Sequence, residues 1–405
     1  MAEKAPLQPR KRARTIRWTI LALVLGGVTT LGILHQYGGV TKPVGVDALC
    51  PFGGLETLGS LLGGGGLIKR VALSSVLLLV AAVVTALVFR RAFCGRICPL
   101  GYLQELFGGL GNRIFGRRFI MPETLDRPAR YLKYVVLALI LYFTWRTGDM
   151  VIRSYDPWVA YNHLTSAELF TENAIALGVL VVVLLGSLFF DRFYCKYACP
   201  MGAFLGLISR FSVFKVRRDA EACIDCRLCD RACPVNVQVS TIESMASAEC
   251  IDCGECVAAC PAAGALGTRT RSGQTLAPVQ AALLTVALFG LLVAIASASG
   301  AFAWTVPTLT QSVAETGAED FDLELIKGST VLADVAEATG IPAAVFTRVY
   351  GVPESEQTRP LKELKDVYGC SPGEVRAFVA AYRVDPAVAD TWAPGVFHEE
   401  GEESH

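Results

Sequence analysis

Eight of the fourteen cysteines occur in two copies of one spacing, C-x2-C-x2-C-x3-C-P. This spacing binds two [4Fe–4S] clusters, because three thiolates of one run hold one cluster and the fourth crosses to the other. Two complete copies, each ending in proline, favour clusters over a disulfide scaffold or zinc sites. The two predicted ligand sets are Cys223, Cys226, Cys229 and Cys260, and Cys250, Cys253, Cys256 and Cys233.

Four further cysteines belong to a repeated C-x3-C-P motif, because the segment 87–101 recurs as 188–202. Residues four apart share one face of a helix, so each motif is expected to present two thiols in one direction. Four thiolates would suit a further iron–sulfur cluster or another metal, and unliganded thiols are the alternative. Neighbouring Arg91, Arg96, Arg192 and Lys196 are expected to lower the pKa of these thiols. The cysteines are Cys94, Cys98, Cys195 and Cys199.

Polar residues at the other ends of the same repeats could contact a quinone or a redox partner. Cys50 precedes Pro51 in the first half, and Asp156 precedes Pro157 in the second. His35 and His163 are further candidates for this site, although each also fits an interfacial structural role. Similarly, a lone cysteine is usually a small buried apolar residue. The sequence contains no C-x-x-C-H motif, which excludes covalently attached c-type haem.

The elements that position these residues are strongly apolar. Hydrophobic residues make up 53% of the chain, charged residues only 18%, and the mean hydropathy is +0.45. Four of five uncharged runs approach the roughly 17–25 residues that cross a bilayer as a helix, and the shorter third run spans it if Tyr131–Lys133 and Arg146 snorkel at its ends, so we expect five membrane-spanning helices. The runs are 18–34, 71–89, 134–145, 174–190 and 276–305.

The distribution of Lys and Arg predicts the orientation. Six lie in the first 17 residues, eight in 90–130 and ten in 191–275, which places these segments in the cytoplasm. The segments 35–70, 146–173 and 300–405 are then expected to face outward. Residues 1–37 are interpreted as an uncleaved anchor rather than a signal peptide. The sequence thus predicts a multi-pass protein of the inner (cytoplasmic) membrane.

The expected fold is a membrane α-helical protein with an inserted α+β domain. Residues 1–212 form the membrane core, 213–272 a cytoplasmic dicluster domain and 273–305 the fifth helix. Residues 306–405 form an outward helical module with an acidic tail, in which Leu332–Gly340 and Leu361–Gly369 each predict a helix ended by glycine. We expect this module to dock an extracytoplasmic redox partner and Cys370 to lie in its core. Its acidic balance does not fit nucleic-acid binding.

Residues 45–262 resemble the NapH/NosR-type membrane polyferredoxins, on the strength of the paired C-x3-C-P motifs and the eight-cysteine pattern. The resemblance implies an electron-transfer subunit, such as a quinol dehydrogenase, that connects the quinone pool or a cytoplasmic donor to a periplasmic reductase. The resemblance covers the four C-x3-C-P cysteines and the eight cysteines of the dicluster pattern. The flavin-binding domain of the NosR type is absent, and the C-terminal module has no counterpart among the family's motifs.

Two other interpretations remain open. The layout is also similar to assembly factors of cbb3-type oxidases, which would reduce copper, although residues 306–405 look helical and lack a Met/His-rich copper site. A third interpretation is a docking or maturation scaffold whose clusters are structural.

Overall fold

The computed structural model describes residues 7–37, 43, 49–62, 73–147, 151–165, 169, 173–305, 309, 323–326, 328 and 330–392. The chain divides into two compact units, Met1–Thr305 and Val306–His405. Both are mostly helical in their described parts, and a single small sheet occurs among the described residues of the first unit.

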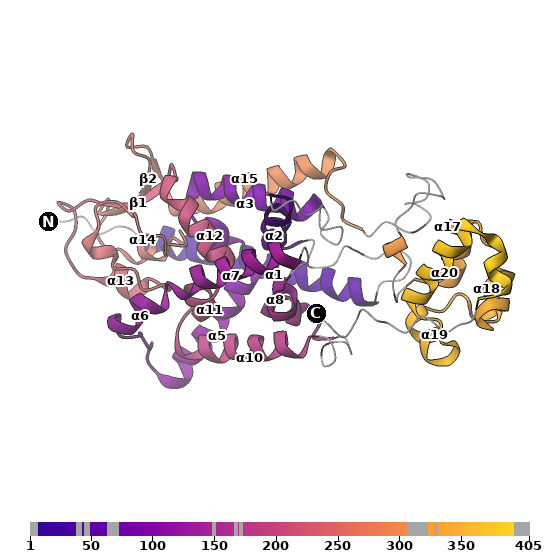
Figure 1. Ribbon diagram of the computed structural model, residues 1–405. Coiled ribbons are helices and arrows are strands. Elements are labelled where there is room, and N and C mark those ends of the chain that lie inside the picture. Colours follow the sequence, from indigo (N-terminus) through magenta and orange to yellow (C-terminus); the bar gives the residue numbers. More distant parts are fainter. Residues whose placement is uncertain are drawn as a thin grey trace. The chain divides into compact units, whose positions relative to one another are not determined.

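Long helices form the body of the first unit, where they run side by side (Figure 1). A helix covers most or all of each of the five uncharged runs. Two of these helices, α1 and α15, are long and apolar enough to cross a membrane, whereas α3 and α10 are shorter apolar helices. Five crossings therefore remain a prediction. The helices are α1 (Leu7–Tyr37), α3 (Leu73–Phe89), α7 (Leu132–Thr147), α10 (Ala174–Phe189) and α15 (Pro278–Ala298).

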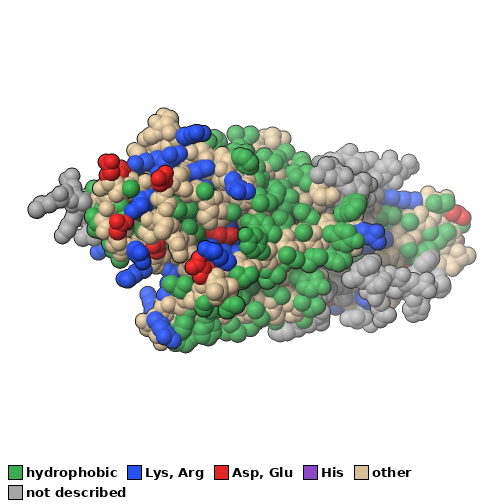
Figure 2. Space-filling model, turned by 60° about the vertical axis from the view of Figure 1, so that its left-hand side comes forward, with side chains coloured by type: hydrophobic (Ala, Val, Ile, Leu, Met, Phe, Trp, Pro, Cys, Tyr) green, Lys and Arg blue, Asp and Glu red, His purple; other side chains and the backbone are tan. Residues whose placement is uncertain are grey.

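The outer faces of these helices are apolar and exposed. Each of Val182 on α10, Leu139 on α7 and Leu291 on α15 exposes half or more of its side chain. Contiguous apolar surface of this kind is unfavourable in water and marks contact with lipid or protein. Figure 2 shows hydrophobic side chains over the helical body and charged ones gathered at one end. Together with the two candidate spans, this surface indicates a membrane protein.

Both C-x3-C-P motifs contain a helix break. Helix α4 (Ala92–Arg96) ends at Ile97, and α5 (Pro99–Phe115) begins directly after Cys98. In the second copy, α11 (Phe193–Tyr197) is followed by α12 (Pro200–Ile208). Proline has no N–H to donate and its fixed φ suits the first helical position, so each proline starts a new helix. The prediction that the two cysteines of a motif lie on one continuous helix face is therefore wrong.

Shorter helices complete the body. Helices α2 (Pro51–Leu62) and α8 (Pro157–Asn162) lie away from the sheet, whereas α6 (Glu123–Ala129) lies at the same end of the unit as the sheet (Figure 1). Helix α2 packs against α3 and α7, and α8 packs against α10. The 3-10 element η2 (Val151–Tyr155) leads into α8, and η3 (Ser209–Phe211) follows α12.

The dicluster segment is built on an antiparallel sheet in which β1 (Lys215–Arg218) pairs with β2 (Leu266–Arg269), and β2 with β3 (Thr275–Leu276). Val216 and Leu266 turn inward, whereas their neighbours are more exposed. Helices α13 (Leu228–Ala232) and α14 (Glu255–Ala259) pack together, and η4 (Val239–Thr241) packs against α13. This arrangement brings the two cysteine runs side by side.

The second unit consists of two similar helix pairs: α17 (Leu332–Thr339) with α18 (Ala343–Tyr350), and α19 (Leu361–Tyr368) with α20 (Pro372–Val384). Gly340 and Gly369 end the first helix of each pair in the left-handed conformation, as the repeat predicts. Cys370 is fully buried in the core, as expected. The elements η5 (Leu323–Leu325), η6 (Glu354–Glu356) and η7 (Pro386–Asp390) complete the unit, and the acidic tail lies outside the described residues.

Candidate iron–sulfur centres

The two cysteine runs of the dicluster segment share one loop shape. Asp225 and Asp252, which precede the second cysteine of each run, both have positive φ, at 50° and 49°. Arg227 and Gly254 follow that cysteine and are also left-handed. Such a backbone curls tightly, and few non-glycine residues adopt it without a structural reason. The same left-handed residues at equivalent positions indicate that both loops are shaped to enclose the same kind of group.

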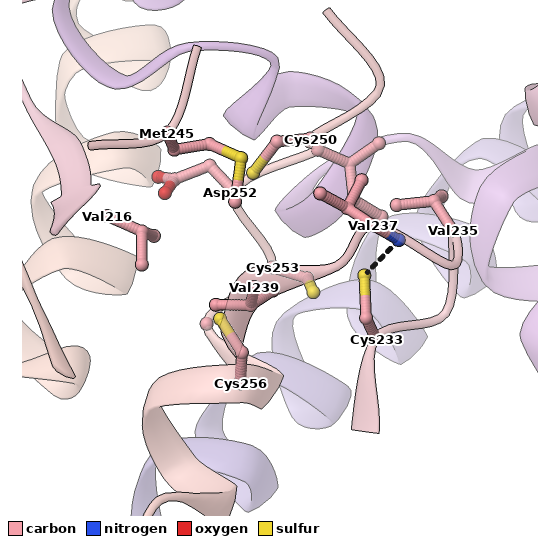
Figure 3. Close-up of a pocket in the computed structure, with 12 residues that line it drawn as sticks. Val216, Cys233, Val235, Val237, Val239, Met245, Cys250, Asp252, Cys253 and Cys256 are labelled. Atoms are coloured by element: carbon pink, nitrogen blue, oxygen red, sulfur yellow. Dashed lines mark hydrogen bonds between the residues drawn. The ribbon is translucent and has the colours of Figure 1, made fainter. Parts of the chain in front are cut away.

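One of the two predicted ligand sets surrounds a single internal cavity. Cys250, Cys253 and Cys256 reach it from one run, and Cys233 reaches it from the other (Figure 3). The backbone N–H of Val237 donates to the Sγ of Cys233 over 3.3 Å. The remaining wall is largely apolar, with Asp252 as its charged member. Three thiols from one run and one from the other is the arrangement that a crossed [4Fe–4S] pair requires.

The other predicted set lies nearer the surface. Cys226 is exposed and Cys223 half-buried, whereas Cys229 and Cys260 are buried. Burial, with Asp230 and Cys260 adding to it, raises the pKa of Cys229 to about 11, so Cys229 and Cys260 are electrostatic neighbours across the two runs. The two sets thus differ in access: one is enclosed and the other reaches solvent.

The enclosed set lies directly against the first C-x3-C-P loop. A Cβ on Gly95 would stand 2.1 Å from the carbonyl oxygen of Ile251, so only glycine allows the two backbones to approach so closely. Arg96 forms a buried ion pair with Asp252 over 3.0 Å. Ile251 and Asp252 lie between two cysteines of the enclosed set, and Gly95 and Arg96 lie between Cys94 and Cys98. The dicluster segment and the C-x3-C-P loop therefore form one packed core.

A buried charge cluster supports the same loop. Both oxygens of Glu105 accept from Nη2 of Arg17, at 2.6 and 2.8 Å, and Oε1 also accepts from Nε of Arg192 at 2.7 Å. The two arginines donate onward to the backbone carbonyls of Gly95 and Cys94. Burial would raise the pKa of Glu105, but Arg192 and Arg17 hold it below its usual value. The cluster thus fixes the backbone of the first C-x3-C-P loop.

Among the C-x3-C-P cysteines, Cys94 and Cys195 are buried and Cys98 and Cys199 half-buried, and their pKa values disagree with the sequence expectation. Burial raises the pKa of Cys98 to about 12 and also raises the pKa values of Cys195 and Cys199. Arg192 lowers the pKa of Cys195, but burial outweighs it. The expected lowering of these pKa values is therefore wrong. The four thiols nevertheless influence one another, because Cys94, Cys98 and Cys195 all raise the pKa of Cys199.

Known proteins share these cysteine motifs. The family model described as a 4Fe-4S binding domain matches residues 71–118 and 173–219, and a 4Fe-4S dicluster domain matches residues 215–270. NapH of Escherichia coli, named a ferredoxin-type protein, is 28% identical over 55% of this chain and 73% of its own length. The regulatory protein NosR of Pseudomonas aeruginosa is 29% identical over 36% of this chain and 20% of its own. The cysteine-bearing region is a NapH/NosR-type polyferredoxin.

The polyferredoxin region does not account for the whole chain. YccM of Escherichia coli, named as a candidate electron transport protein, is 36% identical over 52% of this chain and 59% of its own length. The chain spans 59–66% of the first three curated relatives that it matches. No solved structure matches the chain.

The polyferredoxin fits the clusters that its motifs imply. Within the described residues, no three Cys, His, Asp or Glu side chains converge tightly enough for one metal ion. A [4Fe–4S] cluster has four irons and takes a thiolate at each, so its ligands need not converge on one point. The enclosed cavity with its four thiols is consistent with such a cluster. The assignment of individual ligands remains a prediction.

The outer-face candidates separate into two groups. Cys50 and Asp156 line one cavity, together with Cys98 and Cys199. His35 and His163 are not among its lining residues: Nδ1 of His35 lies 2.7 Å from the carbonyl oxygen of Pro43, and His163 caps the end of α8. Tyr194 also lines this cavity, but its sequence context gave no signal for it.

Proposed function

We propose that this polyferredoxin is a membrane-bound electron-transfer protein that relays electrons between the quinone pool or a cytoplasmic donor and an extracytoplasmic redox partner. The observation that supports the proposal is the contact of Gly95 with Ile251, because it joins the two kinds of cysteine motif in one core. When bound, [4Fe–4S] clusters supply one-electron transfer. The protein supplies their spacing, orientation and exclusion of water.

The order of the cysteine sets supports a relay. The set with exposed Cys226 is open to a soluble partner. The enclosed set, behind it, packs against the first C-x3-C-P loop, which carries buried Cys94 and half-buried Cys98. An electron entering at either end would thus pass between thiol sets carried by segments of one packed core. The buried pair of Arg96 with Asp252 and that of Lys133 with Glu249 hold the sets in register.

The two ends of the relay follow from the sequence. We propose that the dicluster segment is cytoplasmic and that residues 306–405 dock the extracytoplasmic partner. The apolar outer faces of α7, α10 and α15 would place the C-x3-C-P thiols at the membrane boundary, where a quinone can arrive laterally. Of the four outer-face candidates, Cys50 and Asp156 line the cavity beside these thiols, whereas neither histidine does.

The test is anaerobic reduction of the full-length protein in detergent. A short-chain quinol should bleach the visible cluster absorbance, and Cys195→Ala with Cys199→Ala should slow this bleaching at least tenfold. Cys370→Ala, which removes a buried cysteine from the other unit, is the control and should leave the rate unchanged. Fewer than about four irons per chain would refute cluster-based transfer, since two clusters need eight. Reduction by dithionite but not by quinol would refute the quinone part alone.

A further inference from the structure

An apolar cavity of about 390 Å³ lies in the helical body of the first unit. Its walls come from α1, α3 and α15 and from the starts of α2, α5 and α12. Its polar side chains include Cys50, Cys98, Cys199, Asp156 and Tyr194. Three thiols and a carboxylate from four separated segments thus border one apolar space.

The three cysteines share one sequence pattern. Each is followed by proline and, two residues later, by glycine, as Cys50-Pro51-Phe52-Gly53, Cys98-Pro99-Leu100-Gly101 and Cys199-Pro200-Met201-Gly202. In each case the proline is the first residue of a helix. Cys50 thus has the same place relative to α2 as Cys98 has to α5 and Cys199 to α12. Both family-model matches leave Cys50 outside their ranges.

The charge of the cavity favours a metal centre over an anionic ligand. None of the described residues that line it is Lys, Arg or His, although Arg192 and Arg91 lie behind Cys98 and Cys199. Thiolates and a carboxylate facing apolar walls are costly to ionise unless a cation pairs with them. Iron is such a cation, and thiolates are the ligands that iron–sulfur clusters use.

The other two C-x3-C-P cysteines have different surroundings. Cys94 and Cys195 are not among the residues that line the cavity. Cys195 accepts a hydrogen bond from Nε2 of Gln104 over 3.2 Å. The backbone carbonyl of Cys94 accepts from Arg192 over 2.6 Å, in the charge cluster around Glu105. The two cysteines of each motif thus differ, and only the second of each borders the cavity.

We propose that Cys50 is an iron ligand of the membrane-side centre, together with Cys98 and Cys199, and that Asp156 supplies the fourth donor. Asp156 occupies the place of Cys50 in the second repeat, where it precedes Pro157 at the start of α8. Its Oδ1 accepts from the N–H of Trp158 over 2.9 Å, which fixes the carboxylate at the cavity. This inference rests on the proposed function, and it does not alter the clusters proposed for the dicluster segment.

The experiment compares two replacements of Cys50 in the full-length protein, purified anaerobically in detergent. Cys50→Val keeps the volume and apolar character but cannot bind iron, whereas Cys50→Ser keeps a donor atom. We expect Cys50→Val and Cys98→Val each to lose about four irons per chain, with the EPR signals of the dicluster segment retained. We expect Cys50→Ser to keep more iron than Cys50→Val and to show an altered EPR signal.

Controls separate ligation from packing. If Cys50 only fills space, Cys50→Val will retain the wild-type iron content, and this result would overturn the proposal. Loss of every cluster signal in both variants would also overturn it, because it would mark a folding role. Asp156→Asn keeps the helix cap and should shift the EPR signal of the membrane-side centre. Iron content and EPR do not depend on quinol turnover. The assignment of Cys50 as a ligand can therefore fail while the proposed relay stands, and the relay can fail while the assignment stands.

Discussion

The two cysteine-lined cavities of the first unit differ in how the chain builds them and in their electrostatics. The enclosed dicluster cavity takes its four thiols from two short runs that fold next to each other. The membrane-side cavity takes Cys50, Cys98, Cys199 and Asp156 from four segments spread over most of the unit. Local spacing is therefore sufficient to indicate the first site, whereas the second becomes visible only when the helices have packed.

Their surroundings differ in charge as well. The dicluster loops are held by buried ion pairs, such as Arg96 with Asp252 and Arg17 with Glu255. The described lining of the membrane-side cavity has no basic residue. Fixed cations beside a site favour its reduced, more negative state, while an apolar wall disfavours added charge. Arginines therefore favour electron uptake at both sites: they pair with acidic residues in the dicluster loops, whereas at the membrane-side site Arg192 and Arg91 lie behind Cys98 and Cys199, outside the cavity wall.

The largest effect should come from neutralising the charge cluster between the two regions. Glu105→Gln would leave buried Arg192 without its carboxylate and Arg17 with Glu255 alone. Loss of one partner from a buried ion pair costs about 3–5 kcal/mol. We therefore expect a marked fall in the thermal unfolding midpoint in detergent, followed by the loss of cluster absorbance.

The matched control for that charge cluster lies on the surface. Glu123 pairs with Arg127 over 2.7 Å, but their side chains are 60% and 78% exposed. Solvent screens such a pair, so Glu123→Gln should change stability by no more than about 0.5 kcal/mol. Equal effects of the two substitutions would show that the buried cluster does not support the contact between the two regions.

A smaller effect should follow from filling the contact itself. Gly95→Ala places a methyl group 2.1 Å from the backbone oxygen of Ile251, so one backbone must move. Overpacking of this kind costs about 1–3 kcal/mol. Gly109→Ala, also within a helix, is the control because its Cβ would meet nothing within 4 Å. We expect only the first variant to slow electron exchange between the two thiol sets, measured by rapid-freeze EPR after partial reduction. Equal rates in both variants would argue against this contact as the route.

The sequence allowed the contiguous features to be predicted and missed those that depend on burial or on distant segments. The helix pairs of the second unit follow the predicted pattern because Gly340 and Gly369 act within their own helices. The helix break before Pro99 was missed, although proline at that position was a usable signal. The pKa of Cys98 was misjudged because burial, which raises it, has no local sequence signature. The grouping of Cys50 with Cys98 was signalled only by a thrice-repeated Cys-Pro-x-Gly pattern.

The smallest effect concerns a cysteine outside both regions, which isolates what burial alone does to a thiol. Burial, with Glu374 adding to it, raises the pKa of Cys370 from 9.0 to about 12. The folded state therefore holds this proton more tightly than the unfolded state does. Stability is unaffected below about pH 9 and should fall by about 1.4 kcal/mol for each pH unit between 9 and 12.

Cys370→Val removes this titration while keeping the side chain apolar and of similar size. The pH dependence is measured on the full-length protein by the protection of backbone amides in α20 against hydrogen exchange, corrected for the intrinsic rate at each pH. The pKa of Tyr350 is also raised by burial, so both proteins should lose some protection at high pH. We expect the loss above pH 9 to be steeper in the wild type than in the variant. Parallel profiles would mean that the Cys370 thiol has the same pKa in the folded and unfolded states. Burial alone would then not raise the pKa of a cysteine that binds no cluster.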